Sequence, residues 1–254
     1  YGAILNLSNE NLIQKISFNV VDEDTSIIGE EAFMNPSNNQ EFTVGYFISK
    51  KLKPINIDFG YRLDQIERSG SVFHEDEGET DFFKIDESVG SFALSIGRDI
   101  NDALSLNVGY SNFERVPSVI ELFMNGPHLA TGRFEVGDPN LKNETSKNLD
   151  VTFNFEYNEY FGFASFYRND ANNYISLIDD HHDDEDDSEE SHHGCHEEDE
   201  DVAGSTNPEP HPHPELICAN YVQEDAEFNG YEIEVGRTIS MGSGDLTISF
   251  GRDV

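Results

Sequence analysis

The sequence predicts an all-β protein: an antiparallel up-and-down transmembrane β-barrel with long extracellular loops, present here in part as about ten strands. The first observation behind this prediction is that short and long connectors alternate along the chain. The short connectors lie near residues 8–11, 51–54, 99–101, 158–160 and 240–243, and the long ones near 21–40, 68–81, 114–145 and 179–220. All long connectors therefore lie at the same end of the strands. Outer-membrane barrels have this arrangement, with tight turns toward the periplasm and large loops outside the cell.

The second observation is the alternation of apolar and polar residues between the connectors. Leu104, Leu106, Val108 and Tyr110 alternate with Ser105, Asn107, Gly109 and Ser111. Successive side chains of a strand point to opposite faces, so each such strand has one apolar and one polar face. The apolar face would meet lipid in a barrel, or a packed core in a soluble sheet. The gathering of long loops at one end, and a second face rich in Asp, Asn, Gly and Arg, favour the barrel.

The individual strands follow from this period of two. We expect strands at residues 1–7, 12–20, 41–50, 55–67, 82–98, 102–113, 146–157, 161–178, 221–239 and 244–252. The alternate apolar positions include Ile16, Phe18 and Val20, then Ile57, Phe59, Tyr61 and Leu63, then Phe92, Leu94 and Ile96, then Leu149, Val151, Phe153, Phe155 and Tyr157. Pro54 suits a turn because it cannot donate to a central ladder, and residues 240–245 form a glycine-rich hairpin turn.

The chain shows no sign of a helical membrane anchor or a leader. It has no run of about 18 apolar residues, which a transmembrane helix would need. Its first residues carry neither the basic nor the apolar region of a signal peptide. Because a secreted barrel needs such a peptide, we expect this chain to be a mature or internal fragment.

The charge of the chain restricts its partners. Its 254 residues include 51 acidic and 15 basic ones, for a formal net charge of −36. Nucleic acid is therefore not expected as a partner, because phosphate binding needs clustered Lys and Arg. Cations are the natural partners of such a chain. We also expect no enzymatic activity, because the sequence has no nucleophile elbow, no phosphate-binding glycine loop and no HExxH helix.

The longest connector, residues 179–220, is rich in His, Asp and Glu. Of the nine histidines in the chain, seven lie in it: His181, His182, His192, His193, His196, His211 and His213. Carboxylates alone would favour calcium or magnesium, whereas neutral imidazoles shift the expectation to zinc, nickel or copper. The irregular spacing suits a flexible loop that collects metal ions. The alternative is a solvated acidic loop with incidental histidines.

Both cysteines of the chain, Cys195 and Cys218, lie in the same connector. An even number in an exposed loop indicates a disulfide in an oxidising compartment, which would stabilise the fold by roughly 3 kcal/mol on the chain-entropy model. Two alternatives stay open. The cysteines could be free thiols, or Cys195 could join the metal-binding histidines beside it.

The connector 114–145 and its flanks contain the most specific motifs. They are an aromatic-x-Arg-x-Pro-Ser-x-x-Glu-Leu-Phe run at 113–123, Gly-Pro-His-x-Ala-Thr-Gly at 126–132, Phe-Glu-x-Gly-Asp-Pro-Asn-Leu at 134–141 and Glu-x-Ser-x-Asn at 144–148. Together with Tyr221-x-Gln223-x-Asp225, this pattern resembles the barrel signature of TonB-dependent outer-membrane receptors, from about residue 40 onward. The resemblance implies a bacterial outer-membrane barrel of about 22 strands in contact with lipid. It also implies an N-terminal plug through which the TonB complex acts. We recognise no plug in residues 1–254, which we expect to form one partial barrel domain.

The histidine-rich insert and the Gly-Pro-His segment resemble the zinc-uptake branch of the family. By this resemblance, His128 is a metal ligand that plug residues complete. Haem receptors of the superfamily also carry a histidine between Arg-x-Pro and Pro-Asn-Leu segments, where it ligates haem iron, as an imidazole can. His128 could otherwise bond to loop backbone, and Glu121 could be its partner or be structural. We therefore expect a receptor fragment for a divalent metal ion, zinc first. The alternatives are a haem receptor with His128 as iron ligand and, from another class, a soluble metal-sequestering β protein.

Overall fold

The computed structural model describes residues 1–29, 32–74, 78–180 and 216–254, which form one twelve-stranded sheet and one short helix. The strands of the wall are β1 (Gly2–Ser8), β2 (Leu12–Thr25), β3 (Ser37–Leu52), β4 (Ile55–His74), β5 (Glu79–Asn101), β6 (Leu104–Arg115), β9 (Glu144–Tyr157), β10 (Tyr160–Asp179), β11 (Ile217–Ser240) and β12 (Asp245–Asp253). Between β6 and β9 lie α1 (Val119–Phe123) and the short strands β7 (Asn125–His128) and β8 (Arg133–Val136).

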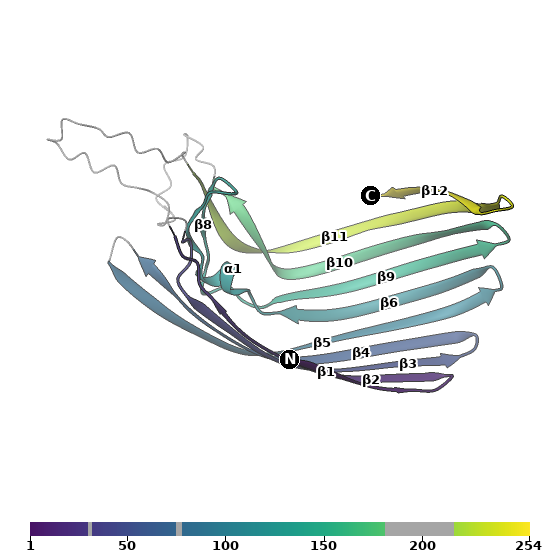
Figure 1. Ribbon diagram of the computed structural model, residues 1–254, viewed down its shortest axis with the longest axis horizontal. Coiled ribbons are helices and arrows are strands. Elements are labelled where there is room, and N and C mark those ends of the chain that lie inside the picture. The colour runs from purple at the N-terminus through teal and green to yellow at the C-terminus, as the bar shows by residue number, and fades with distance from the viewer. Residues whose placement is uncertain (30–31, 75–77, 181–215) are drawn as a thin grey trace.

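Each wall strand pairs antiparallel with the next along the wall, from β1 to β6 and then through β9, β10, β11 and β12. Strands β1 and β12 do not pair with each other, so the sheet is an open, curved wall (Figure 1). The tight turns between wall strands lie at one end of this wall, and α1 and β8 lie at the other (Figure 1). Strand β7 pairs with β8 and lies at that same end. The predicted fold, part of an up-and-down barrel with its long connections at one end, is confirmed.

The register of the sheet aligns the apolar residues of neighbouring strands into rows. One row crosses six strands through Ile57, Ile96, Val108, Val151, Phe166 and Tyr231. The adjacent row, which belongs to the opposite face, consists of Asn56, Gly97, Asn107, Thr152, Ser165 and Glu232. The sheet therefore has one continuous apolar face and one polar face.

The apolar face is uncovered along the wall. Leu63 is 50% exposed and Val235 is 57% exposed. The described strands form a single sheet, so no second sheet covers this face. Lipid satisfies such a face, whereas water would not.

A charged side chain at a lipid-facing position in the middle of a wall strand should lower the free energy of unfolding. Arginine in place of Val108 should destabilise the membrane-inserted protein by about 2–4 kcal/mol, as expected for a charged side chain that faces the bilayer midplane. Arginine in place of Asn107, the next residue on the polar face, is the matched control and should cost much less. Urea titration of the intact protein folded into liposomes would measure both. Equal effects would contradict the assignment of the two faces.

The packed core of the molecule lies at the loop end of the wall. Leu122, Phe123 and Met124 are each at most 1% exposed, although α1 has only five residues. The connections between strands thus pack against one another at this end.

In the described part of the chain, no helix is long and apolar enough to span a membrane.

Several predicted boundaries were wrong. Strand β5 begins at Glu79 rather than near 82, and β11 begins at Ile217 rather than near 221. The alternation ceases where a strand leaves the lipid, but backbone pairing continues beyond that point. The predicted turn at 99–101 also belongs to β5, which runs to Asn101 through a register shift. The strand count was about ten, and β7 and β8 add two that the connector 114–145 concealed.

Candidate functional site at the loop end of the sheet

Helix α1 starts at a capping box formed by Ser118 and Glu121. The N–H of Glu121 donates to Oγ of Ser118 at 3.2 Å, and the N–H of Ser118 donates to Oε2 of Glu121 at 2.6 Å. These bonds satisfy donors that the first turn of a helix leaves unpaired. Arg115 donates from Nη1 to both carboxylate oxygens of Glu121, at 3.0 and 2.7 Å. Burial alone would raise the pKa of Glu121, but the bonds from Arg115 and Ser118 hold that pKa below its ordinary value. Glu121 therefore has a structural role.

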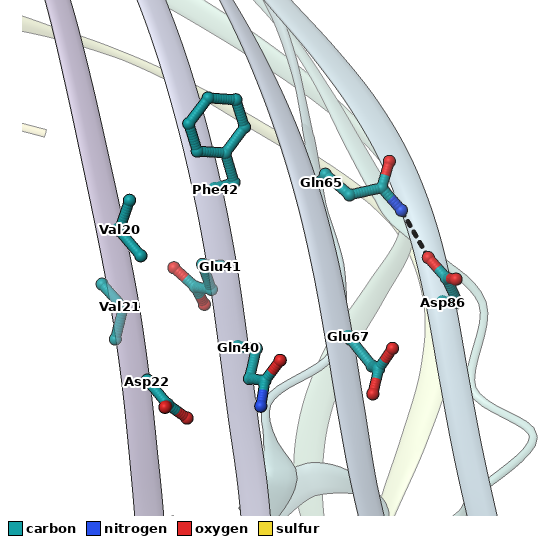
Figure 2. A pocket seen from close by; sticks show the side chains of 9 residues that line it. All are labelled: Val20, Val21, Asp22, Gln40, Glu41, Phe42, Gln65, Glu67 and Asp86. Carbon is teal, nitrogen blue, oxygen red and sulfur yellow. Dashed lines mark hydrogen bonds between the residues drawn. The ribbon is translucent and has the colours of Figure 1, made fainter.

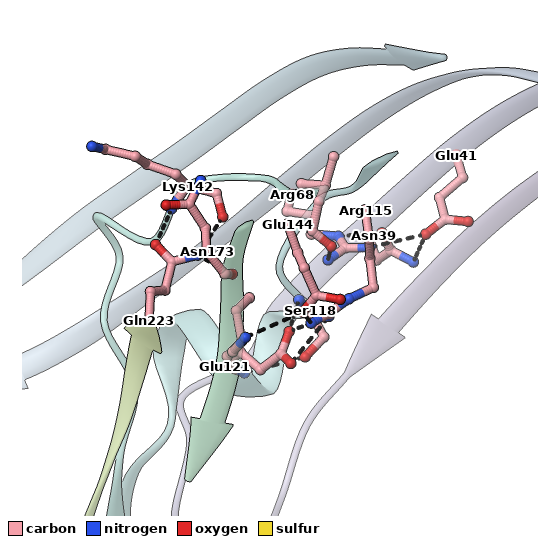
Figure 3. Close-up of polar contacts among 12 residues, drawn as sticks. Asn39, Glu41, Arg68, Arg115, Ser118, Glu121, Lys142, Glu144, Asn173 and Gln223 are labelled. Carbon is pink, nitrogen blue, oxygen red and sulfur yellow. Dashed lines mark hydrogen bonds and ion pairs between the residues drawn. The ribbon is translucent and has the colours of Figure 1, made fainter. Parts of the chain in front are cut away.

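Arg115 also binds a second carboxylate, that of Glu144 at the start of β9. Its Nη2 donates to Oε2 of Glu144 at 3.0 Å (Figure 3). The same oxygen accepts the N–H of Ile175 in β10 at 3.1 Å. One guanidinium thus joins α1 to two neighbouring wall strands.

A second arginine, Arg68 of β4, fastens the chain just before α1. Its Nη1 donates to the carbonyl oxygen of Val116 at 3.1 Å. Its Nη2 pairs with Glu41 at 3.2 Å, and its Nε donates to Oδ1 of Asn39 at 3.2 Å (Figure 3). Arg68 is only 8% exposed, so these partners are needed to offset the cost of burying its charge.

The segment between β8 and β9 is held by Gln223 of β11. The side-chain amide of Gln223 accepts the N–H of Lys142 at 2.8 Å and donates to the carbonyl oxygen of Lys142 at 2.7 Å (Figure 3). It also donates to the carbonyl oxygen of Asn173, a residue with a φ of 53°. The amide of Gln223 therefore bonds both backbone groups of Lys142, as a neighbouring strand would.

An apolar cluster unites these connections. It consists of Met34, Val72, Leu122, Phe123, Leu141 and Ile175, with Phe33, Ile85 and Tyr221 among the partly buried residues around it. These residues come from seven different segments of the chain, so the cluster holds the loop end together. Gly70 faces the ring of Phe123 so closely that a Cβ there would lie 2.4 Å from Cδ2.

The hairpin β7–β8 stands between the loop before β3 and the strand β11. The N–H of Asn125 donates to the carbonyl oxygen of Phe33 at 2.8 Å, and Met34 forms a bridge with Met124. A Cβ at Gly126 would lie 2.7 Å from Cα of Phe33, so only glycine permits this approach. On its other side, β8 pairs with β11 in parallel, from Ile217 to Asn220. The hairpin is thus fixed on both edges.

His128 is the last residue of β7 and is partly exposed. Its Nδ1 lies 2.9 Å from Oε1 of Glu135 in β8. The ring of Phe33 lies against the imidazole, with centroids 5.0 Å apart and planes inclined by 34°. The side chain of His128 is 32% exposed, against 4% for that of Glu135. Within the described part of the chain, Nε2 of His128 has no hydrogen-bond partner.

The other predicted ligands cannot be placed. His181, His182, His192, His193, His196, His211 and His213 lie outside the described residues. Cys195 does too, so its pairing with Cys218 stays a prediction. Among the residues that the structure describes, no group of three or more His, Cys, Asp or Glu is placed to hold a metal ion. The sequence did not single out Glu135, which is only one residue of the Phe-Glu-x-Gly-Asp run. The signal that could have found it is the spacing around Gly132, because a tight turn there pairs His128 with Arg133 and makes Glu135 its diagonal neighbour on the same face.

A pocket of about 330 Å³ lies across β2, β3, β4 and β5 (Figure 2). Its lining consists of Val20, Val21, Asp22, Gln40, Glu41, Phe42, Gln65, Glu67 and Asp86. Lys84 pairs with Glu67 at 2.9 Å, and Arg68 pairs with Glu41, so two of the four carboxylates are already neutralised. Gln65 donates to Asp86 (Figure 2). With no basic side chain in its lining, this pocket does not suit an anion.

An open sheet with a lipid-facing side, tight turns at one end and packed loops at the other defines part of an outer-membrane barrel. The sequence of residues 15–252 matches the family model described as TonB dependent receptor-like, beta-barrel, and the chain belongs to this family. It is thus part of a protein of the bacterial outer membrane.

Relatives of known sequence match shorter stretches. The heme/hemopexin utilization protein C of Haemophilus influenzae is 33% identical over 92 residues, which cover 31% of this chain and 13% of that protein. The hemoglobin and hemoglobin-haptoglobin-binding protein B of the same organism is 33% identical over 98 residues, which cover 38% of this chain and 9% of that protein. The chain therefore matches only a small part of either relative.

Solved structures share the fold along the whole chain. The hemophore receptor HasR of Serratia marcescens, in complex with its hemophore HasA and heme, superposes with a TM-score of 0.64 at 15% identity. The match covers 100% of this chain and 40% of HasR. The copper transporter OprC gives a TM-score of 0.61 at 13% identity, with 99% of this chain and 38% of OprC covered. At these identities the likeness concerns the fold alone.

Proposed function

We propose that this chain is the part of an outer-membrane receptor that binds a divalent metal ion, with zinc as the first candidate, and that His128 is one of its ligands. The observation that carries the proposal is the state of the His128 ring. One nitrogen is engaged by a buried carboxylate, while Nε2 has no partner among the described residues and the side chain is 32% exposed. Zinc is commonly bound by an imidazole whose other nitrogen bonds to a carboxylate. The chemistry is binding and handover, without a bond being broken.

The charge of the molecule supports a cation as the cargo. A net charge of −36 attracts cations and raises their concentration near the loops. Haem carries two propionates, which basic side chains usually receive. In the hairpin itself, the cross-strand partner of His128 is Arg133, but Asp179 already accepts from its Nε at 2.6 Å and its Nη2 at 2.9 Å. This arginine is therefore not free to receive a propionate.

The ends of the histidine-rich stretch lie next to the His128 hairpin. The N–H of Ile217 donates to the carbonyl oxygen of Gly132 at 3.1 Å, and Asp179 pairs with Arg133. The N–H of Asp180 donates to the carbonyl oxygen of Cys218 at 2.8 Å. The chain therefore leaves and re-enters the described fold beside the hairpin turn. We propose that the seven histidines of this stretch collect metal ions and pass them to His128.

One imidazole cannot bind zinc tightly, since zinc in proteins has three or four protein ligands. We propose that further ligands come from residues 181–215 or from the plug that the family resemblance implies. Import would then depend on the TonB complex acting through that plug.

Haem uptake is the second candidate, because the relatives named above are haem and haemoglobin proteins. A haem iron needs only one axial imidazole from this part of the chain. The structure is compatible with this role for His128. Zinc needs further protein ligands around the His128 imidazole, whereas haem iron needs only this one. Binding measurements in solution can therefore distinguish the two functions.

The test is titration of the intact protein in detergent with zinc, followed by calorimetry, and with haemin, followed by the Soret band. We expect zinc binding that weakens when the seven histidines of 181–213 are replaced by Asn, and no Soret shift that depends on His128. A Soret shift lost in His128→Ala, with zinc binding unaffected by either set of substitutions, would replace the zinc proposal by the haem one.

A further inference from the structure

Glu135 is a buried carboxylate in β8, a strand of the loop end that pairs with β7 on one edge and with β11 on the other. In β8 it lies opposite Gly126 of β7 on one side and opposite Ala219 of β11 on the other. Its side chain is 4% exposed, and Ala219 is fully buried. A carboxylate is costly to bury unless its oxygens have partners, so its position calls for an explanation.

The hairpin register brings this carboxylate to His128. Because His128 pairs with Arg133, Glu135 is its diagonal neighbour on the same face of the hairpin. Oε1 of Glu135 lies 2.9 Å from Nδ1 of His128. Oγ1 of Thr131 lies 2.9 Å from that same Oε1 and 2.9 Å from the carbonyl oxygen of His128, and it can donate to either. The contact is therefore set by the turn between the strands, which includes Gly132 at a φ of 69°.

We propose that Glu135 is a positioning residue that accepts a hydrogen bond from Nδ1–H of His128, fixes the ring in that tautomer and orients the lone pair of Nε2 toward the metal ion. This inference rests on the proposed function. A neutral imidazole carries its proton on either Nδ1 or Nε2. A hydrogen-bond acceptor beside one of these nitrogens favours the tautomer that has the proton there. With the proton held on Nδ1, Nε2 is available as a ligand.

Phe33 completes the constraint on the ring. Its ring lies over one face of the imidazole, and its backbone carbonyl is held by Asn125. Rotation of His128 about its last side-chain bond would have to displace Phe33 as well as break the bond to Glu135. The imidazole is thus held at one nitrogen and one face, and it remains accessible at Nε2.

The proposal separates two substitutions of similar size. Glu135→Gln keeps an oxygen that accepts from Nδ1–H but removes the charge. Glu135→Met keeps the length of the side chain and removes the acceptor. A merely structural role of Glu135 gives both variants the same effect on His128. A positioning role gives them different effects, and Thr131→Val serves as a control that leaves the acceptor in place.

The experiment is nitrogen NMR of the intact, metal-free protein labelled in its histidines, under conditions where imidazoles are neutral. The spectrum of His128→Asn identifies the resonances of His128. We expect the Nδ1–H tautomer in the wild type, in Glu135→Gln and in Thr131→Val, and the Nε2–H tautomer in Glu135→Met. Zinc affinity should fall about 10- to 100-fold in Glu135→Met and less in Glu135→Gln.

An unchanged His128 tautomer in Glu135→Met overturns the proposal, whatever zinc binding does. A tautomer that changes as expected, together with zinc binding that is normal in both Glu135→Met and His128→Asn, supports the orientation of the ring by Glu135 and overturns the proposed function. The metal-free spectrum thus tests the positioning role of Glu135, and the zinc titration separately tests the proposed function.

Discussion

Replacing Phe123 by Ala should destabilise the loop end of the protein by about 3–5 kcal/mol, which is the largest effect we expect from a single truncation. Phe123 is 1% exposed and lies in the cluster that joins α1 to β4, to β10 and to Leu141 in the connection before β9. Its ring contacts Phe83, with centroids 6.3 Å apart, and covers Gly70. Truncation to Ala would leave a cavity where the ring now packs, and the cost of this cavity adds to the lost burial of the ring.

Hydrogen exchange of the intact protein would measure this effect, because the backbone N–H groups of the loop end should exchange faster when the cluster is weakened. The N–H of Gly137, which donates to the carbonyl oxygen of Met124 at 2.7 Å, is one such reporter. Ile120→Ala is the matched control on the same helix, since Ile120 is 43% exposed and should change stability by less than about 0.5 kcal/mol. Similar losses of protection in both variants would show that the loop end does not depend on this cluster.

Replacing His128 by Asn should lower the zinc affinity of the intact protein by at least about 10- to 100-fold. Loss of a residue that only supports a metal ligand has an effect of this size, and loss of the ligand itself should cost no less. The side-chain amide of Asn can still donate to Glu135, so the buried carboxylate keeps a partner. What the substitution removes is Nε2. Calorimetric titration of the wild type and the variant measures the difference.

The seven histidines of residues 181–213 supply the comparison. Their replacement by Asn should reduce the number of weakly bound zinc ions, whereas His128→Asn should abolish the tightest binding event and leave the weak ones. If the tight event persists in His128→Asn and disappears with the seven histidines, the tight site lies in that stretch and His128 is not a ligand.

The wall could be predicted from sequence because lipid imposes a regular pattern on it. Val108 and Val151 face lipid from paired positions, while Asn107 and Thr152 share the opposite face, and this period of two is visible in the chain alone. Beyond the membrane the pattern stops, because both faces meet water or other loops. That is why the ends of β5 and β11 could not be located.

The candidate site was predictable only in part. His128 stood out as a histidine inside a recognisable run, but its partner did not. Glu135 reaches His128 through the four-residue turn between β7 and β8, and it is buried because β8 also pairs in parallel with β11, a strand more than 80 residues further along the chain. A pairing of that kind leaves no local pattern in either segment. The bonds of Arg115 and Gln223 show the same limit, since each spans several elements and explains motif residues whose role the sequence does not reveal.

The most direct test of the account is to locate the metal in the zinc-loaded intact protein by anomalous X-ray scattering at the zinc edge. We expect a zinc ion at about 2.0–2.1 Å from Nε2 of His128, with Nδ1 of the same ring still bonded to Glu135. Zinc found only among residues 181–215, with the His128 ring unligated, would contradict it.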